Sequence, residues 1–393
     1  MRSRFIAAAS AAIILFALSC FDQQLDRSAP TAPLAAKGGA KLKSISVTPS
    51  ASSVNIGQSV QLTATATPGS VSPTYVWTSS NPSVATVTQS GLVSGVGVGS
   101  ATITAGASGV SGAATVTVVD PSADPVLVGA GDIASCTSSG DEATAKLLDG
   151  IPGTVFTLGD NAYESGTTTE YNNCYGPSWG RHKARTQPTP GNHEYNTANA
   201  SGYYGYFGGL AGDPTKGYYS YTLGQWHVIV LNSNSDCGAI SCAAGSAQEQ
   251  WLRADLAAHP TTCTLAYWHH PLFSFSTESG PSPSVRPLWR VLSRAGVDVV
   301  VNGHSHNYQR WAPQTPGGHA SSTGIREFVV GTGGASHYAF QDGPWPENLV
   351  AGQTDAFGVL RLALKAEGYR WQWVSARGQP AFDDTSPRTV PCH

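Results

Sequence analysis

Two patterns of apolar and polar residues divide the chain near residue 120. Residues 44–119 hold short runs in which apolar and polar positions alternate, separated by Gly, Pro and Asn. Such alternation is typical of half-buried β-strands, and this spacing of short strands predicts an all-β sandwich. Trp77 on a middle strand supplies a bulky core side chain. The clearest runs are residues 44–47, 60–65, 84–87, 101–104 and 115–118.

Beyond a linker at residues 120–125, continuous apolar runs alternate with runs of helical periodicity. One expected helix begins at Ser246 and has Glu249 three residues later, which is the sequence of a capping box. This alternation predicts α/β layers whose strands lead into loops at one sheet edge, where chemistry usually collects. Strands are expected at residues 126–128, 154–158, 226–231, 264–268, 297–301, 327–331 and within 357–374, and helices at 141–148, 246–257 and 284–294.

The first residues of the chain indicate export. Arg2 and Arg4 precede an apolar run that ends in a small residue and Cys20. This order predicts a secretory signal peptide over residues 1–20, followed by a flexible linker over residues 21–42. The end of the run resembles a bacterial lipoprotein signal, which would leave Cys20 lipidated; ordinary cleavage nearby is the alternative. We therefore expect a bacterial protein that is lipid-anchored in the cell envelope or secreted.

Charge excludes some partners. Charged residues form 12% of the chain, and 22 Lys and Arg oppose 25 Asp and Glu, for a formal net charge of −3. No basic run is present, so the sequence lacks the footprint of a nucleic-acid-binding protein. No second apolar stretch approaches the length of a membrane span. Contact with a membrane is therefore expected only through the lipid anchor.

The number of cysteines is typical of a protein in an oxidising compartment. Seven are present, and removal of Cys20 with the signal leaves six, which allow 15 disulfide pairings. Cys237 and Cys242 flank a short Gly-containing loop and are the pair we expect most. The pairing of the other four stays open, with Cys136–Cys174 and Cys263–Cys392 reached by elimination.

Residues 43–119 resemble the bacterial Ig-like domains of group 2. The resemblance rests on Val47-Thr48-Pro49, on the run from Trp77 to Ala85, and on Gly91-Leu92-Val93. It implies a spacer or an adhesive module that contacts the cell surface. No cluster of titratable groups supports a specific binding role, because the segment from residue 44 to 119 contains no Asp, Glu, Lys or Arg.

In the second region, five strand-like runs end in residues that can bind metals. Each end carries a Gly or Pro that allows a sharp turn. One such end alone is more often a turn with an Asx hydrogen bond, but five in order favour one site. Oxygen donors combined with imidazoles suit iron, manganese or zinc. The donors, in chain order, are Asp132, Asp160, Tyr163, Asn192, His269, His304 and His306.

Over residues 126–377 this pattern resembles the metallophosphoesterase superfamily, and the Tyr three residues after Asp160 makes it most similar to the purple acid phosphatases. The resemblance implies a four-layer αββα sandwich spanning residues 126–393. It also implies two metal ions, Fe(III) plus a divalent Zn, Mn or Fe. Asp132, Tyr163 and His306 would hold the first, Asn192, His269 and His304 the second, and Asp160 would bridge them.

The resemblance further implies hydrolysis of small-molecule phosphate monoesters by attack of a metal-bound hydroxide. His193 would stabilise the transition state or protonate the leaving alcohol, with Glu194 as its orienting partner, and His270 would contact phosphate. His337, in a Gly-rich loop, either approaches the site or is a surface residue. A phosphodiesterase or nucleotide hydrolase with the same metals is the nearest alternative. A surface-binding protein with a relic phosphatase domain is the other.

Overall fold

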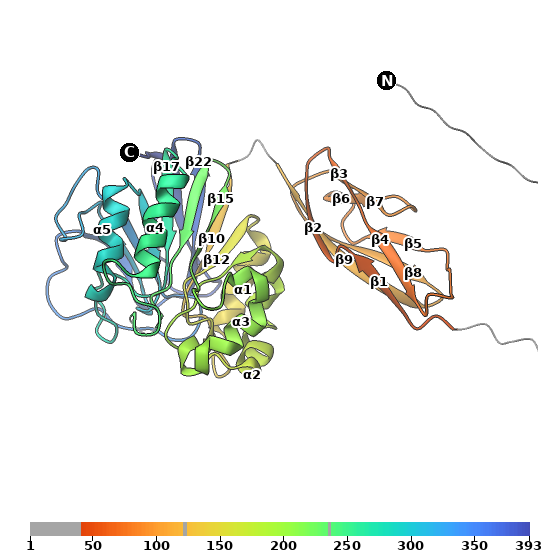
Figure 1. Cartoon of the computed structure of the whole chain (residues 1–393), viewed down its shortest axis with the longest axis horizontal. Coiled ribbons are helices and arrows are strands. Elements are labelled where there is room, and N and C mark those ends of the chain that lie inside the picture. Colours follow the sequence, from red (N-terminus) through yellow and green to blue (C-terminus); the bar gives the residue numbers. More distant parts are fainter. Residues whose placement is uncertain (1–40, 121–123, 235–236) are drawn as a thin grey trace, which may run out of the picture.

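The computed structural model describes residues 41–120, 124–234 and 237–393 (Figure 1). The predicted signal peptide, Cys20 and the linker up to residue 40 lie outside this part of the chain. Within it, no helix combines the length and the apolar character needed to cross a membrane.

The first domain is an all-β, immunoglobulin-like sandwich. Its sheets have the strand orders β2-β9-β8-β5 and β3-β7-β6, and β1 pairs with β4. In β8, Ala101, Ile103 and Ala105 are buried while Thr102 faces solvent, as the alternation predicted. The strands are β1 (Ser44–Thr48), β2 (Ala51–Asn55), β3 (Ser59–Gln61), β4 (Thr63–Thr67), β5 (Val76–Ser79), β6 (Ala85–Val87), β7 (Leu92–Gly95), β8 (Gly99–Ala107) and β9 (Val110–Val119).

One predicted strand of this domain is two strands. The run at residues 60–65 divides at Leu62, which is 1% exposed, so that β3 pairs with β7 and β4 pairs with β1. Leu62 donates its backbone N–H to the Gly91 carbonyl at 2.9 Å. The alternation of buried and exposed side chains continues from β3 into β4. The sequence pattern alone therefore does not reveal that the chain changes pairing partners at Leu62.

The second domain contains two sheets. A six-stranded sheet has the order β14-β12-β10-β22-β23-β24, and a seven-stranded sheet has the order β15-β16-β17-β18-β20-β19-β21. The first uses β10 (Val126–Ala130), β12 (Thr154–Thr157), β14 (Thr186–Gln187), β22 (Gly358–Lys365), β23 (Gly368–Ser375) and β24 (Val390–Pro391). The second uses β15 (Tyr219–Leu223), β16 (Trp226–Val230), β17 (Cys263–Tyr267), β18 (Val299–Asn302), β19 (Tyr308–Trp311), β20 (Arg326–Val330) and β21 (Leu349–Gln353).

Alternate residues of the central strands face two different cores. Val228 and Val230 of β16 belong to the core that also contains residues of the first sheet, whereas Ile229 packs with helix residues such as Leu252 and Leu292. Both faces of the second sheet are covered, which explains why its strands are continuous apolar runs. The domain is a four-layer αββα sandwich, with α1 (Gly140–Gly150) packed against β22 and α4 (Ala247–Ala258) and α5 (Arg286–Arg294) on the other side (Figure 1).

Helix ends differ in detail from the prediction. The Ser246 hydroxyl accepts from the Glu249 N–H at 3.2 Å, but the Glu249 carboxylate reaches the Gly245 N–H instead of closing a capping box. The described residues do contain a full capping box, formed by Thr167 and Glu170 at the start of α2 (Thr168–Glu170). The strand expected from residue 297 begins two residues later, at β18.

The structure contains all three disulfides reached from the sequence, Cys136–Cys174, Cys237–Cys242 and Cys263–Cys392. The last spans 129 residues and attaches the C-terminal segment to β17. A bond that closes so long a loop stabilises the domain by about 4–5 kcal/mol through lost entropy of the unfolded chain.

Candidate metal centre

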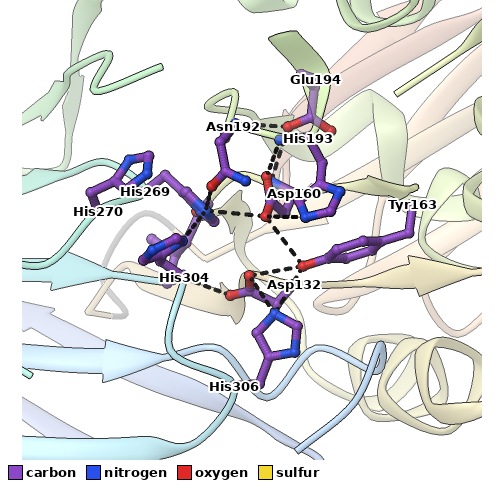
Figure 2. A network of polar contacts seen from close by, with 12 residues as sticks. Asp132, Asp160, Tyr163, Asn192, His193, Glu194, His269, His270, His304 and His306 are labelled. Carbon is purple, nitrogen blue, oxygen red and sulfur yellow. Dashed lines mark hydrogen bonds and ion pairs between the residues drawn. The ribbon is translucent and has the colours of Figure 1, made fainter. Parts of the chain in front are cut away.

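Loops at the carboxyl ends of strands bring all seven predicted donors together (Figure 2). Five are buried, and Asn192 and His304 are partly exposed. Asp132 follows β10 and Asp160 follows β12, whereas His269 follows β17 of the other sheet. The remaining donors are Tyr163 at the end of β13 (Ala162–Tyr163), Asn192 in the loop after β14, and His304 and His306 between β18 and β19.

Three of the donors have a strained backbone conformation. Asp132, Asp160 and His304 have φ values of +60°, +49° and +67°, in the left-handed region that residues other than Gly rarely adopt. Such residues cost on the order of 1–3 kcal/mol each and cluster at functional sites. Gly191 is required for a different reason, because a Cβ there would lie 2.2 Å from Asp160 Oδ1.

The first group of donors surrounds the Tyr163 hydroxyl. That oxygen lies 3.0 Å from Asp132 Oδ1, 3.0 Å from His306 Nε2 and 3.3 Å from Asp160 Oδ2. His306 Nε2 is 3.2 Å from Asp132 Oδ1. Ligand atoms at about 2.0–2.1 Å from one ion lie about 2.9–3.4 Å from each other, so the four atoms have the spacing of a coordination shell.

The second group surrounds His269 Nε2. This nitrogen lies 3.0 Å from Asn192 Oδ1, 3.2 Å from His304 Nδ1 and 3.2 Å from Asp160 Oδ2. His269 Nδ1 faces the Leu158 carbonyl at 2.6 Å and must donate to it, which leaves a lone pair on Nε2 in the neutral ring. A lone pair that faces two oxygens and a second imidazole needs a cation or a proton between them. The donor set therefore fits a metal ion.

Asp160 Oδ2 belongs to both groups. It is the carboxylate oxygen near Tyr163 Oη and also the one near His269 Nε2, so a single atom joins the two sets of donors. The other oxygen, Oδ1, accepts from the His193 backbone N–H at 2.9 Å and is fixed by it. These contacts fit the bridging position predicted for Asp160.

Charges in the site are strongly coupled. Burial opposes protonation of His269, but the Asp160 carboxylate outweighs burial and raises the pKa of the imidazole to about 9. Burial and then repulsion by His269 lower the pKa of His304 to about 4. Burial and the carboxylates of Asp132 and Asp160 hold the pKa of Tyr163 well above its usual value. The phenol would thus ionise only with a cation beside it.

Two family models match the chain. The bacterial Ig-like domain (group 2) matches residues 41–118, and the calcineurin-like phosphoesterase family matches residues 127–308. Over residues 127–308 the second domain is similar to the calcineurin-like phosphoesterases, and we call it the phosphoesterase domain below after this match. Both matches confirm the resemblances seen in the sequence.

Two curated proteins similar to this chain are purple acid phosphatases. Purple acid phosphatase 22 of Arabidopsis thaliana is 30% identical over 165 residues, 40% of this chain and 36% of the relative. Purple acid phosphatase 15 of the same plant is 25% identical over 276 residues, 60% and 51% of the two chains. The chain thus spans only 36% to 51% of the length of these curated relatives. The solved structure of purple acid phosphatase PPD1 from yellow lupin (Lupinus luteus) seeds has a TM-score of 0.58 at 15% identity, covering 83% of this chain and 67% of that one, which shows a shared fold.

His193 lies at the edge of this cluster of donors. Its ring is 4.4 Å from the Tyr163 ring, and its Nε2 is 3.8 Å from Asp160 Oδ2. Nδ1 lies 2.6 Å from the Glu164 carbonyl, to which it donates. Nε2 therefore becomes a proton donor when the ring is protonated, and a quarter of the side chain is open to solvent.

The structure places Glu194 differently from the prediction that it orients His193. Its carboxylate is fully buried and accepts from the backbone N–H groups of Asp160, at 2.9 Å, and Gly191, at 2.7 Å. It also accepts from Asn161 and Ala162 and from the Tyr171 hydroxyl. Glu194 thus joins the loop that carries Asp160 to the loop that carries Asn192, and the Glu164 carbonyl orients His193 instead.

His270 is close to the centre but turned to its own partner. Its Nδ1 lies 2.8 Å from Ser233 Oγ, and its ring is 4.3 Å from the His304 ring. Burial and then His269 and His304 hold the pKa of His270 well below its usual value. A neutral imidazole in this position is available as a hydrogen-bonding group for a bound anion.

The sequence analysis named His337 in the Gly-rich loop and missed its two neighbours, Ser336 and Tyr338, which contact the centre. His337 stacks on Phe357, with ring centroids 4.0 Å apart. Ser336 instead binds His306 Nδ1 at 2.7 Å, and Tyr338 stacks on the His306 ring at 4.0 Å and 6°. No sequence motif marks a serine or a tyrosine that contacts a predicted ligand, so the sequence offers no signal for Ser336 or Tyr338.

Proposed function

We propose that this protein is an exported phosphatase that hydrolyses phosphate monoesters with two metal ions. The observation that carries the proposal is the position of Asp160 Oδ2, which two separate groups of donors share. One group would hold Fe(III) through Asp132, Tyr163 and His306. The other would hold divalent Zn, Mn or Fe through Asn192, His269 and His304, with Asp160 bridging.

When bound, two such ions activate water as the nucleophile and neutralise phosphate oxygens. The chain itself supplies the rest of the chemistry. His193, held by the Glu164 carbonyl, presents Nε2 at the open side of the centre and donates a proton to the leaving alcohol. His270, neutral and held by Ser233, donates or accepts a hydrogen bond at the phosphate. Glu194 keeps the two loops in register.

Hydrolysis of monoesters is supported by the names of the relatives, both of which are phosphatases. The test is to purify the mature chain, determine iron, zinc and manganese, and assay p-nitrophenyl phosphate beside bis-p-nitrophenyl phosphate. We expect about two metals per chain and preference for the monoester. A preference for the diester would favour a phosphodiesterase.

Asp160→Ala tests the shared carboxylate. We expect loss of metal and a fall in kcat of at least about a thousandfold. Asp213→Ala is the matched control, because Asp213 lies in a surface turn with Thr215 and Lys216. Fewer than one metal per wild-type chain, or full turnover by Asp160→Ala, would contradict the proposal.

Export is proposed from the sequence of residues 1–20, with Cys20 as the lipid attachment site. Three disulfides in the described residues support an oxidising compartment. In this arrangement the Ig-like domain acts as a spacer, or contacts the cell surface. Labelling with a fatty-acid analogue tests the anchor, and Cys20→Ala should abolish the label.

A further inference from the structure

The buried imidazole of His270 has one nitrogen without a protein partner. Its side chain is 3% exposed, and Nδ1 lies 2.8 Å from Ser233 Oγ. Nε2 forms no hydrogen bond within the described residues, although the ring lies beside that of His304, one of the donors (Figure 2). A buried polar atom without a partner calls for a ligand or a water. Whether Nε2 donates to that ligand or accepts from it depends on which nitrogen carries the proton.

The hydrogen bonds of Ser233 determine the position of this proton. The backbone N–H of His270 can only donate, and Ser233 Oγ accepts from it at 3.0 Å. The hydroxyl keeps one proton of its own, and in the described part of the chain its other hydrogen-bond partner is His270 Nδ1. Ser233 is fully buried, so solvent offers no second acceptor. If Nδ1 carried the imidazole proton, the buried hydroxyl would have no acceptor, which is rare in folded proteins.

Ser233 therefore donates to Nδ1, and the neutral ring carries its proton on Nε2. Both members of this pair are attached to a fixed backbone. Gln248 of α4 accepts from the Asn232 N–H at 2.7 Å and donates to the Asn232 carbonyl at 2.9 Å. The indole N–H of Trp268 donates to the His270 carbonyl at 2.7 Å. The direction of the imidazole is thus set before a ligand arrives.

We infer that Ser233 is a positioning residue that keeps His270 in its Nε2–H form, so that His270 donates a hydrogen bond to a phosphate oxygen of the substrate. This inference rests on the proposed phosphatase function and deepens it. A phosphate dianion offers only acceptors at its oxygens, so the other tautomer would present a lone pair to it and weaken binding. The same contact exists in the bound substrate and in the transition state, so its loss should raise KM more than it lowers kcat.

The first test measures the tautomer by NMR of isotope-labelled histidine side chains in the mature chain loaded with zinc, which has no redox chemistry. Correlations between ring protons and ring nitrogens show which nitrogen is protonated, and the His270 signals are those missing from His270→Ala. We expect a protonated Nε2 in the wild type and a mixture of the two tautomers in Ser233→Ala. A wild-type His270 protonated on Nδ1 overturns the inference, and this measurement needs no turnover.

The second test is inhibition by inorganic phosphate beside turnover of p-nitrophenyl phosphate. Ser233→Ala should raise the inhibition constant of phosphate and KM about tenfold, and lower kcat by less than about threefold. Ser233→Thr keeps the hydroxyl and should restore KM. Ser220→Ala is the control, because Ser220 Oγ also donates to a buried side chain, Asp255, but belongs to neither group of donors; its KM should not change.

Outcomes separate the two proposals. Because Ser233 acts through His270, its removal should have no further effect on KM in the His270→Ala background. A further rise in KM in the double variant, or an unchanged KM in Ser233→Ala, overturns the inference and leaves the phosphatase function intact. Absence of turnover of p-nitrophenyl phosphate by the metal-loaded wild type refutes the phosphatase function itself.

Discussion

The two domains differ in the side chains that they bury against their β-sheets. The Ig-like domain has no Asp, Glu, Lys or Arg between residues 44 and 119, and its core consists of Trp77 and aliphatic residues such as Leu62 and Ile103. The phosphoesterase domain buries carboxylates and imidazoles, among them Asp132, Asp160 and His269, at the edge of its sheets. Buried charges are costly unless they are paired or bind a metal. The first domain therefore depends on apolar packing and on the hydrogen bonds of its sheets, whereas the second also needs partners for its buried charges.

Trp77→Ala should give the largest loss of stability, and this loss should be confined to the Ig-like domain. Removal of this ring, which is 5% exposed, leaves a cavity and should destabilise the domain by about 3–5 kcal/mol. Differential scanning calorimetry should show the loss or early melting of one transition. Turnover of p-nitrophenyl phosphate should match the wild type; a parallel fall in kcat would show that the two domains are not independent.

Stability of the metal-free phosphoesterase domain should depend on pH. His269 has a pKa raised from 6.5 to about 9, so its contribution is complete below pH 6.5 and is lost as the pH rises through about 9; this is about 3 kcal/mol. Burial opposes ionisation of Asp160, but His269 outweighs it and lowers the pKa, so this contribution is lost as the pH falls below about 4.

Urea unfolding of the chelated protein between about pH 2 and pH 10 measures both losses. The Ig-like domain is the internal control, because its strands carry no titratable acid or base and its unfolding should not change. A metal-free phosphoesterase domain of constant stability across pH 6–10 would refute the coupling of Asp160 and His269.

Glu194→Gln should destabilise the phosphoesterase domain by about 2 kcal/mol, because an amide replaces a carboxylate that accepts from four backbone N–H groups. Metal affinity should fall with it, since the two loops lose their shared partner. Glu142→Gln is a surface control, because the side chain of this α1 residue is 42% exposed and pairs with Arg181. Equal stability of both variants would contradict the role assigned to Glu194.

Ser336→Ala should have the smallest effect, a loss of about tenfold in affinity for the metal held by His306. The serine fixes the ring through Nδ1 but supplies no donor to the centre. Metal titration of the chelated protein measures the change, and Ser336→Thr, which keeps the hydroxyl, should restore most of it. Unchanged affinity in Ser336→Ala would show that the Tyr338 stack alone positions His306.

The sequence by itself determined the fold class of each domain and pointed to the donors that the structure brings together in the candidate centre. Periodicity reports which positions are buried, and Gly or Pro after an apolar run marks a strand end, so Asp132, Asp160 and His269 were recognisable as a set. The Cys237–Cys242 disulfide could also be predicted from local sequence, because the two cysteines are 5 residues apart. Local patterns were less reliable where the chain changes sheets, as at Leu62.

Only the tertiary structure decided which partners those residues have. Tyr163 and His306 are 143 residues apart and Asp132 and His304 are 172 apart, and no spacing rule encodes such contacts. Glu194 was predicted to orient His193 but instead accepts from four backbone N–H groups. These groups lie in two loops that the pairing of β12 with β14 brings together. The contacts of Ser336 and Tyr338 with His306 exist only because the loop after β20 lies beside His306 in the folded domain. Local sequence specifies where a strand ends, but the packing of two sheets specifies what meets there.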